Sequence, residues 1–245
     1  MSGAPAPTPP SPFVLWDVDG TLIKGGAAGR LAFADAVAEV FGIDVPAELL
    51  PRMAGKTDPQ IALEILVELG VAAPEARLPG LEAALERALS ARAPQLRAEG
   101  VVLPGVRAAL AALDAAAAIQ TLVTGNVAPN ARTKLAALGL IGEGSRAAGP
   151  LRLDIGAYGS DDRNRDNLVP VALARARAAG LAVAPARTWV VGDTPRDLAC
   201  ARSAGVRCLL VATGGYPLVE LQGAGADAVL PDLADTRTVV RLLTS

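Results

Sequence analysis

The pattern of apolar and polar residues divides the first hundred residues into two kinds of segment. Residues 13–16, Phe-Val-Leu-Trp, are consecutively apolar and predict a short strand that is buried on both faces. Residues 28–41, 59–70 and 78–98 instead carry apolar side chains at helical spacing, with Gly and Pro between them. We therefore expect one core strand followed by a helical module of roughly seventy residues, near the lower end of domain size.

From residue 100 onward, predicted strands and helices alternate. The predicted strands are 119–126, 151–159, 188–193, 206–212 and 227–230. The predicted helices are 106–118, 128–140, 167–179, 195–204 and 231–243, and Pro104-Gly105 precedes the first of them. Such alternation is typical of an α/β fold, here a Rossmann-like parallel sheet flanked by helices on both faces.

This pattern also suggests a domain organisation. If residues 13–16 belong to the parallel sheet, then residues 13–25 and 98–245 form a Rossmann-like core, and residues 26–97 form an inserted α-helical cap domain. Residues 1–12 are crowded with proline, lack periodicity and predict a flexible tail. An active site is expected between the core and the cap.

Composition excludes several classes of function. The formal net charge is −2, which provides no basic surface for nucleic acid. The two cysteines match no zinc spacing, no secretory signal is apparent, and no apolar run approaches the length of a membrane span. We therefore expect a cytoplasmic protein with a small-molecule partner.

The chain contains no histidine. This excludes catalysis by Ser-His-Asp or Cys-His pairs and excludes histidine-rich zinc sites. Carboxylates are the obvious remaining groups for acid–base chemistry, and they favour a hard cation such as Mg²⁺.

Polar residues gather where three predicted strands end. The three clusters are Asp17-Val18-Asp19-Gly20-Thr21, Thr124-Gly125-Asn126 and Gly192-Asp193-Thr194-Pro195-Arg196-Asp197. The carboxyl ends of parallel strands meet at one edge of a sheet, where open α/β sheets bind their ligands. A single polar residue at the end of a strand usually belongs to a turn or caps a helix, but three clusters of polar residues at one edge predict an active site.

In their order and spacing, these motifs resemble those of the haloacid dehalogenase superfamily, over about residues 13–235. The chain most resembles the phosphoglycolate phosphatase-like branch, which has a helical cap inserted after the first strand. The family usually has a lysine before the helix that follows the third core strand, but no lysine follows Lys134 here. Arg163 and Arg165 are the candidates for its place, and we prefer Arg165 because Arg-x-x-Leu then leads into an apolar helix.

The resemblance implies roles for the first two motifs. Asp17 would attack phosphorus and become an aspartyl phosphate, while Asp19 would protonate the leaving oxygen and later activate water. Thr124, the backbone at Gly125 and Asn126, and Arg165 or Arg163 would hold the phosphate oxygens.

The resemblance also implies a magnesium site. The expected ligands are Asp17, Asp193 and the backbone carbonyl of Asp19, with a phosphate oxygen and waters. Asp197 would orient these ligands without binding the metal itself.

Substrate identity is expected to depend on the cap, where residues 52–62 interrupt the helical pattern. Arg52, Lys56 or Thr57 would meet the leaving group when the cap closes. A simpler interpretation is that Thr57 or Asp58 caps the next helix. The two interpretations are compatible.

The leading hypothesis is a magnesium-dependent phosphatase that acts on a small phosphorylated metabolite of the phosphoglycolate or sugar-phosphate type. Asp19 favours ester hydrolysis over dehalogenation, because expelling a halide needs no proton. A phosphomutase would use the same pair of aspartates and remains an alternative. A second alternative is a non-catalytic module that binds a phosphorylated ligand. Such a module would be expected to lose Asp17 or Asp193, but both are present.

Overall fold

A six-stranded parallel sheet forms the centre of the protein, in the order β5-β4-β1-β6-β7-β8. The computed structural model describes residues 10–142 and 149–245, so the tail predicted at 1–12 lies mostly outside the described residues. The strands are β1 (Phe13–Trp16), β4 (Ile119–Thr124), β5 (Ala157–Tyr158), β6 (Thr188–Gly192), β7 (Arg207–Val211) and β8 (Ala228–Leu230). The α/β class predicted from the sequence is confirmed.

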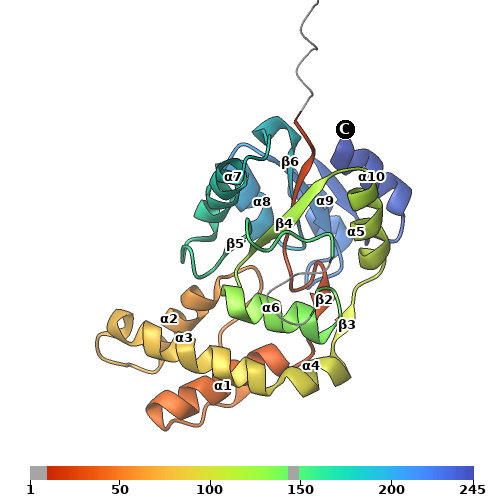
Figure 1. The fold of residues 1–245 in the computed structure, drawn as a ribbon. Helices are drawn as coiled ribbons and strands as arrows, with labels where there is room; N and C mark the ends of the chain where they lie inside the picture. The colour runs from red at the N-terminus through yellow and green to blue at the C-terminus, as the bar shows by residue number, and fades with distance from the viewer. Residues whose placement is uncertain (1–9, 143–148) are drawn as a thin grey trace, which may run out of the picture.

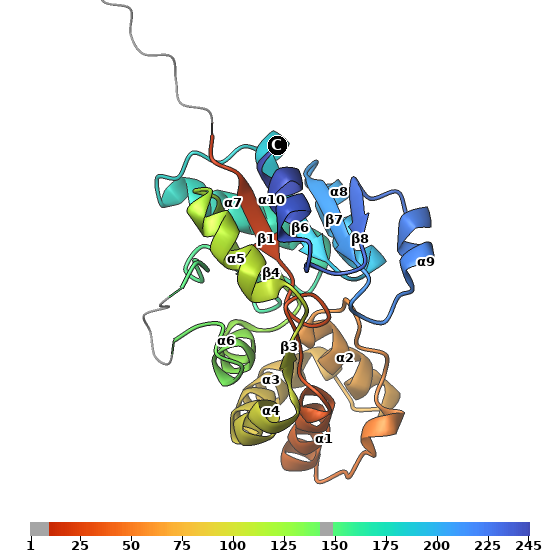
Figure 2. The ribbon, with the colours of Figure 1, turned by 90° about the vertical axis from the view of Figure 1, so that its right-hand side faces the viewer.

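Helices cover both faces of the sheet (Figure 2). One face carries α5 (Val106–Ala115) and α10 (Thr236–Thr244), and the other carries α7 (Leu168–Ala178), α8 (Pro195–Ser203) and α9 (Leu218–Gly223). Alternate side chains of β1 enter opposite layers, because successive strand residues point to opposite faces. Val14 and Trp16 pack with α5 and α10, whereas Phe13 and Leu15 pack with α7 and α8. This double burial explains the continuous apolar run of β1.

Four helices form a separate layer next to the carboxyl edge of the sheet (Figure 1). They are α1 (Ala28–Phe41), α2 (Asp58–Glu68), α3 (Pro74–Ala91) and α4 (Ala93–Glu99), with a short 3₁₀ turn η1 at Ala47–Leu49. These helices, which we call the cap, pack around an apolar cluster of their own. None of the helices in the described part of the chain combines the length and the apolar character needed to cross a membrane.

Two short strands connect the cap to the sheet. Ile23–Lys24 (β2) pairs antiparallel with Val101–Val102 (β3), where the chain enters and leaves the cap. The sequence analysis missed both strands, because two residues are too few to show a period of two.

The helix predicted at 78–98 is in fact two helices. The first, α3, ends at Ala91, and α4 begins at Ala93 with Pro94 in its first turn. Proline has no N–H to donate to the carbonyl four residues earlier, and its ring clashes there, so the helix breaks before it.

Two further predictions were too long. The segment 151–159 makes a single bridge at Leu151 and a strand only at Ala157–Tyr158, because a turn closes between Arg152 and Ile155. The helix predicted at 231–243 begins at Thr236, where the side chain of Asp235 accepts a hydrogen bond from Thr238 N at 3.1 Å.

The start of α2 holds the cap against the core. Asp58 N donates to Gly125 O at 2.7 Å, and Asp58 Oδ2 accepts from Val127 N at 2.9 Å and from Asn130 Nδ2 at 3.2 Å. A Cβ atom on Gly125 would lie 2.1 Å from Lys56 O, so this close approach requires glycine. The cap is therefore docked through a buried carboxylate and a backbone contact.

We predict that Asp58→Ala lowers the free energy of unfolding by roughly 1 to 3 kcal/mol, because Val127 N and Asn130 lose a buried acceptor. Urea unfolding and hydrogen exchange in α2 would measure the effect. Glu68→Ala removes the same charge from an exposed position on the same helix and should change neither readout. Equal stability and exchange for the two variants would show that Asp58 does not hold the cap.

Candidate active site

A cavity of about 470 Å³ lies between the carboxyl edge of the sheet and the cap. The predicted residues that line it are Asp17, Asp19, Lys56, Thr124, Gly125, Asn126, Arg165 and Asp193. Loops after β1, β4 and β6 supply most of them, as expected for a parallel sheet. The structure thus brings together side chains that lie up to 176 residues apart in the sequence, counted from Asp17 to Asp193.

Asp17 lies directly after β1, where its backbone N–H donates to Val191 O at 2.9 Å and so continues the sheet pairing. The residue is 4% exposed. Arg165, from the 3₁₀ turn η2 (Arg165–Asn167), forms an ion pair with Asp17, with Nη2 at 2.9 Å from Oδ1, and also pairs with Asp197. One buried guanidinium therefore bridges two buried carboxylates.

Two carboxyl groups at this edge, those of Asp17 and Asp193, have raised pKa values. Burial raises the pKa of Asp17 to about 6, against the opposing effect of Arg165, with Asp197 and Asp19 adding to the rise. Burial raises the pKa of Asp193 to about 8, and the negative charges of Asp197 and Asp17 add to it. The site therefore holds more negative charge than its arginine offsets.

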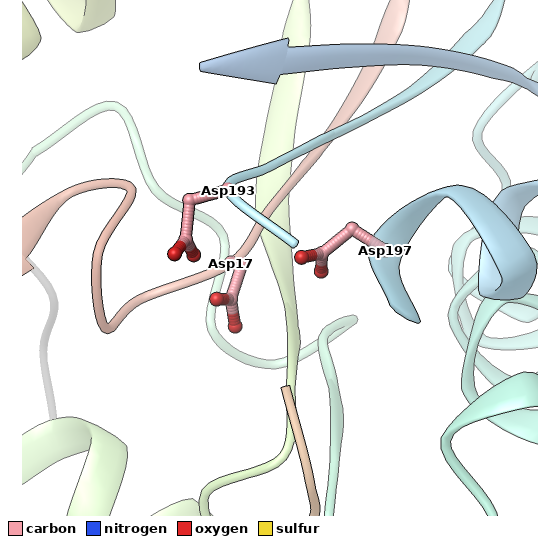
Figure 3. A group of neighbouring side chains, drawn as sticks. All are labelled: Asp17, Asp193 and Asp197. Carbon is pink, nitrogen blue, oxygen red and sulfur yellow. The ribbon is translucent and has the colours of Figure 1, made fainter. Parts of the chain in front are cut away.

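The residues fit a divalent cation. One oxygen from each of Asp17, Asp193 and Asp197 lies within 4.8 Å of the others, and Figure 3 shows the three carboxylates together. Asp197 is already engaged, since Oδ1 pairs with Arg165 while Oδ2 accepts from Thr194 N at 3.0 Å and Thr194 Oγ1 at 2.7 Å. Asp17 and Asp193 are the better candidate ligands, with Asp197 holding Arg165 and the start of α8.

Two glycines make room for the Asp193 carboxylate. A Cβ atom on Gly214 would lie 1.6 Å from Asp193 Oδ2, and one on Gly20, where φ is +85°, would lie 2.5 Å from it. The turn after β1 therefore lies close to Asp193, so that the turn and the loop after β6 can contact the same small ligand.

A second polar group surrounds Thr124 and Asp19. Asn126 Nδ2 donates to Thr124 Oγ1 at 2.9 Å and to Asp19 Oδ2 at 2.8 Å. Lys134, on α6 (Ala128–Ala137), donates to Asp19 Oδ2 and to Asn126 Oδ1, each at 2.6 Å. Burial lowers the pKa of Lys134, but Asp19 and Asp58 outweigh this and raise it above the ordinary value, so the amine is charged.

The predicted cap residues differ in their placement. Lys56 lines the cavity and is paired with Glu64. Thr57 caps α2 by accepting from Gln60 N at 3.2 Å, which confirms the capping interpretation, and it donates to Arg163 O at 2.8 Å. Arg52 instead lies over the ring of Tyr216, 5.4 Å from its centre.

Arg163 does not reach the cavity. Its guanidinium pairs with Glu75 of α3, and both side chains are largely exposed. Arg165 instead lines the cavity and contacts Asp17, so it stays our candidate for the place of the family's lysine.

Sequence analysis missed two residues of the site, Lys134 and Asp58. Lys134 lies in a helix that also carries Asn130 and Arg132, ten residues beyond Thr124, and a lysine in such a helix normally faces solvent. Asp58 was considered only as a helix cap, although it points from the cap into the core. No local signal separates these positions from ordinary surface residues.

Comparison with known proteins places this geometry in a family. A model of haloacid dehalogenase-like hydrolases matches residues 14–202, and a second model of similar hydrolases matches residues 169–236. The chain belongs to the haloacid dehalogenase-like hydrolases. The family resemblance inferred from the three motifs is thus confirmed. No curated protein matches the sequence of this hydrolase.

Solved structures share the fold of this hydrolase at low sequence identity. A hydrolase from Pseudomonas syringae is 21% identical with a TM-score of 0.69, covering 96% of this chain and 100% of its own. CbbY from Rhodobacter sphaeroides in complex with phosphate is 20% identical with a TM-score of 0.69, covering 92% and 96%. A predicted phosphoglycolate phosphatase from Haemophilus somnus 129pt is 19% identical with a TM-score of 0.65, covering 94% and 97%.

The raised pKa values predict how the stability of the metal-free hydrolase depends on pH. Unfolded aspartate titrates near 3.8, whereas Asp17 and Asp193 titrate at about 6 and about 8 in the fold. Between these values the native state binds more protons than the unfolded state, so the free energy of unfolding falls as pH rises from about 4 to about 8. Urea unfolding in chelator at several pH values would measure this slope.

Asp193→Asn should flatten the upper part of that slope, because the amide does not titrate. Asp114→Asn, at an exposed position on α5, should leave it unchanged. Added Mg²⁺ should stabilise the wild type more at pH 8 than at pH 5, since the ion binds ionised carboxylates. Stability that rises with pH in chelator would contradict the burial of these acids.

Proposed function

We propose that the protein is a magnesium-dependent phosphatase that hydrolyses a small phosphorylated metabolite through an aspartyl phosphate on Asp17. The observation that carries this proposal is the placement of Asp17. Asp17 directly follows the central strand β1. Its buried carboxylate contacts Arg165, lies near Asp193 and lines a cavity that Asp19 also lines. A nucleophile, a proton carrier and an anion-binding group thus share one cavity.

The reaction would proceed in two displacements. A carboxylate oxygen of Asp17 attacks phosphorus, the bond to the leaving oxygen breaks, and Asp19 gives that oxygen its proton. Asp19 then takes a proton from water, the water oxygen attacks phosphorus, and release of phosphate restores the Asp17 carboxylate. No histidine is required.

Charge repulsion is the main obstacle to the first step. A phosphate oxygen about 4 Å from a carboxylate meets roughly 4 kcal/mol per charge pair at an effective dielectric near 20. Mg²⁺ held by Asp17, Asp193 and the Asp19 carbonyl would supply the positive charge that Arg165 alone does not. Arg165 Nε is buried and hydrogen-bonds to none of the described residues, so it can donate to a phosphate oxygen.

The cap would face the leaving group of the substrate. Its contribution to the cavity combines Lys56 with apolar side chains such as Phe33 and Leu85. Phosphoglycolate or a sugar phosphate would extend from the core toward these residues. A mutant of CbbY has also been crystallised with xylulose-(1,5)-bisphosphate, and the shared fold is compatible with a substrate of that kind.

Replacing the nucleophile tests the proposal directly. We predict that Asp17→Asn abolishes phosphate release from phosphoglycolate and 4-nitrophenyl phosphate while the protein stays folded, because an amide forms no acyl phosphate. Wild-type activity should disappear in chelator and return with Mg²⁺. Substantial turnover by folded Asp17→Asn, or full activity in excess chelator, would refute the mechanism.

Product analysis separates the phosphatase from the phosphomutase alternative. A phosphatase transfers the phosphoryl group to water and releases inorganic phosphate. A phosphomutase returns it to the sugar, so incubation with a hexose 1-phosphate and a trace of its bisphosphate would yield an isomer instead. Isomerisation faster than phosphate release would favour the alternative.

We also predict a selective effect of Lys56→Ala. If Lys56 meets the leaving group, kcat/KM should fall roughly 10- to 150-fold on phosphoglycolate, the loss of one charge-assisted hydrogen bond, and change little on 4-nitrophenyl phosphate. Arg77→Ala, which removes an exposed charge from α3, is the matched control. Equal losses on both substrates would instead indicate a defect in cap closure.

A further inference from the structure

Lys134 reaches the candidate active site from a helix that the catalytic motifs do not include. Its side chain is 10% exposed and lies on α6, which packs against the cap helices α3 and α4 (Figure 1). Its amine lies 2.6 Å from Asp19 Oδ2 and 2.6 Å from Asn126 Oδ1. Burying a lysine is costly unless its charge is paired, and here the partner is the proposed acid–base residue.

Lys134 also determines the orientation of Asn126. An ammonium group only donates hydrogen bonds, so the amide oxygen of Asn126 must face Lys134. The amide nitrogen then faces the other way and donates to Asp19 Oδ2 at 2.8 Å and Thr124 Oγ1 at 2.9 Å. The three side chains of Lys134, Asn126 and Asp19 therefore form a closed ring of hydrogen bonds.

Both donors of this ring bind the same oxygen of Asp19. Oδ2 accepts from Lys134 and from Asn126, whereas Oδ1 takes no part in the ring. A carboxyl group that carries its proton on Oδ1 still accepts at Oδ2, so the ring is compatible with both steps of the proposed reaction. It leaves Oδ1 as the oxygen that exchanges protons.

Such a restraint matters because the Asp19 side chain is otherwise loosely held. It is 45% exposed and lies in the turn after β1. Without its two donors it would rotate among several staggered positions, and few of these place Oδ1 near the leaving oxygen. A displacement of about 1 Å in a catalytic group can cost about 100-fold in rate.

We propose that Lys134 is a positioning residue that, with Asn126, fixes the Asp19 carboxyl group so that Oδ1 delivers the proton to the leaving group. This inference rests on the proposed phosphatase function. Lys134 acts through Asp19 and not on the phosphate itself.

The test uses two substrates of nearly the same shape, 4-nitrophenyl phosphate and phenyl phosphate. Nitrophenolate leaves without a proton, whereas phenol, with a pKa near that of tyrosine at about 10, needs one. The ratio kcat/KM covers steps up to the first irreversible one, here the formation of the aspartyl phosphate, so it isolates proton donation by Asp19.

Lys134→Met should lower kcat/KM on phenyl phosphate by roughly 10- to 100-fold and on 4-nitrophenyl phosphate by less than about threefold. Arg132→Met removes a positive charge from the same helix, outside the cavity lining, and should leave both values unchanged. Activity on 4-nitrophenyl phosphate also reports that each variant has folded around an intact nucleophile.

A double variant tests whether Lys134 acts through Asp19. If it does, Asp19→Asn combined with Lys134→Met should be no slower on phenyl phosphate than Asp19→Asn alone. Equal losses on both substrates, no loss on either, or additive losses in the double variant would each overturn the inference. A wild type that hydrolyses neither substrate with Mg²⁺ would refute the proposed function itself, and with it this inference.

Discussion

The structure depends on one electrostatic constraint: three buried carboxylates lie together at the carboxyl edge of the sheet, and a buried guanidinium pairs with two of them. Arg165 contacts Asp17 and Asp197, and Asp193 stands beside them with a pKa raised to about 8. Such a cluster is costly to fold in the absence of a further positive charge. The same excess of negative charge makes the site suitable for a divalent cation, whose positive charge would balance the carboxylates and a bound phosphate group.

The cap is held close to this cluster by backbone contacts that side chains would block. A Cβ atom on Gly55 would lie 2.7 Å from Thr194 Oγ1, and one on Gly125 would overlap Lys56 O. Asp58 adds a buried carboxylate that accepts hydrogen bonds from the core. Close glycine contacts and the buried Asp58 carboxylate therefore hold the cap against the core beside the cavity, an arrangement that would help a phosphatase to limit the access of bulk water to its leaving group.

The sequence predicted most of the fold and the central acids, because their signals are local. The run 13–16 reads as a doubly buried strand, and Asp17 follows from its position where that strand ends. The choice of Arg165 over Arg163 depended on how the chain enters the next helix, which is also visible in the sequence. Lys134 could not be found in this way, because its approach to Asp19 depends on how α6 is rotated between the sheet and the cap.

The measurement that tests the account most directly is the capture of the phosphorylated enzyme. A phosphate monoester labelled in its phosphoryl group would be mixed with the enzyme and Mg²⁺ and quenched in acid within milliseconds. One portion would be assayed for protein-bound label. A second portion would be treated with borohydride, which reduces an aspartyl phosphate to homoserine and releases the phosphate, and then mapped by peptide mass spectrometry. The account predicts labelled protein in the first portion and homoserine in place of Asp17 in the second. Turnover without labelled enzyme, or label on a different side chain, would contradict it.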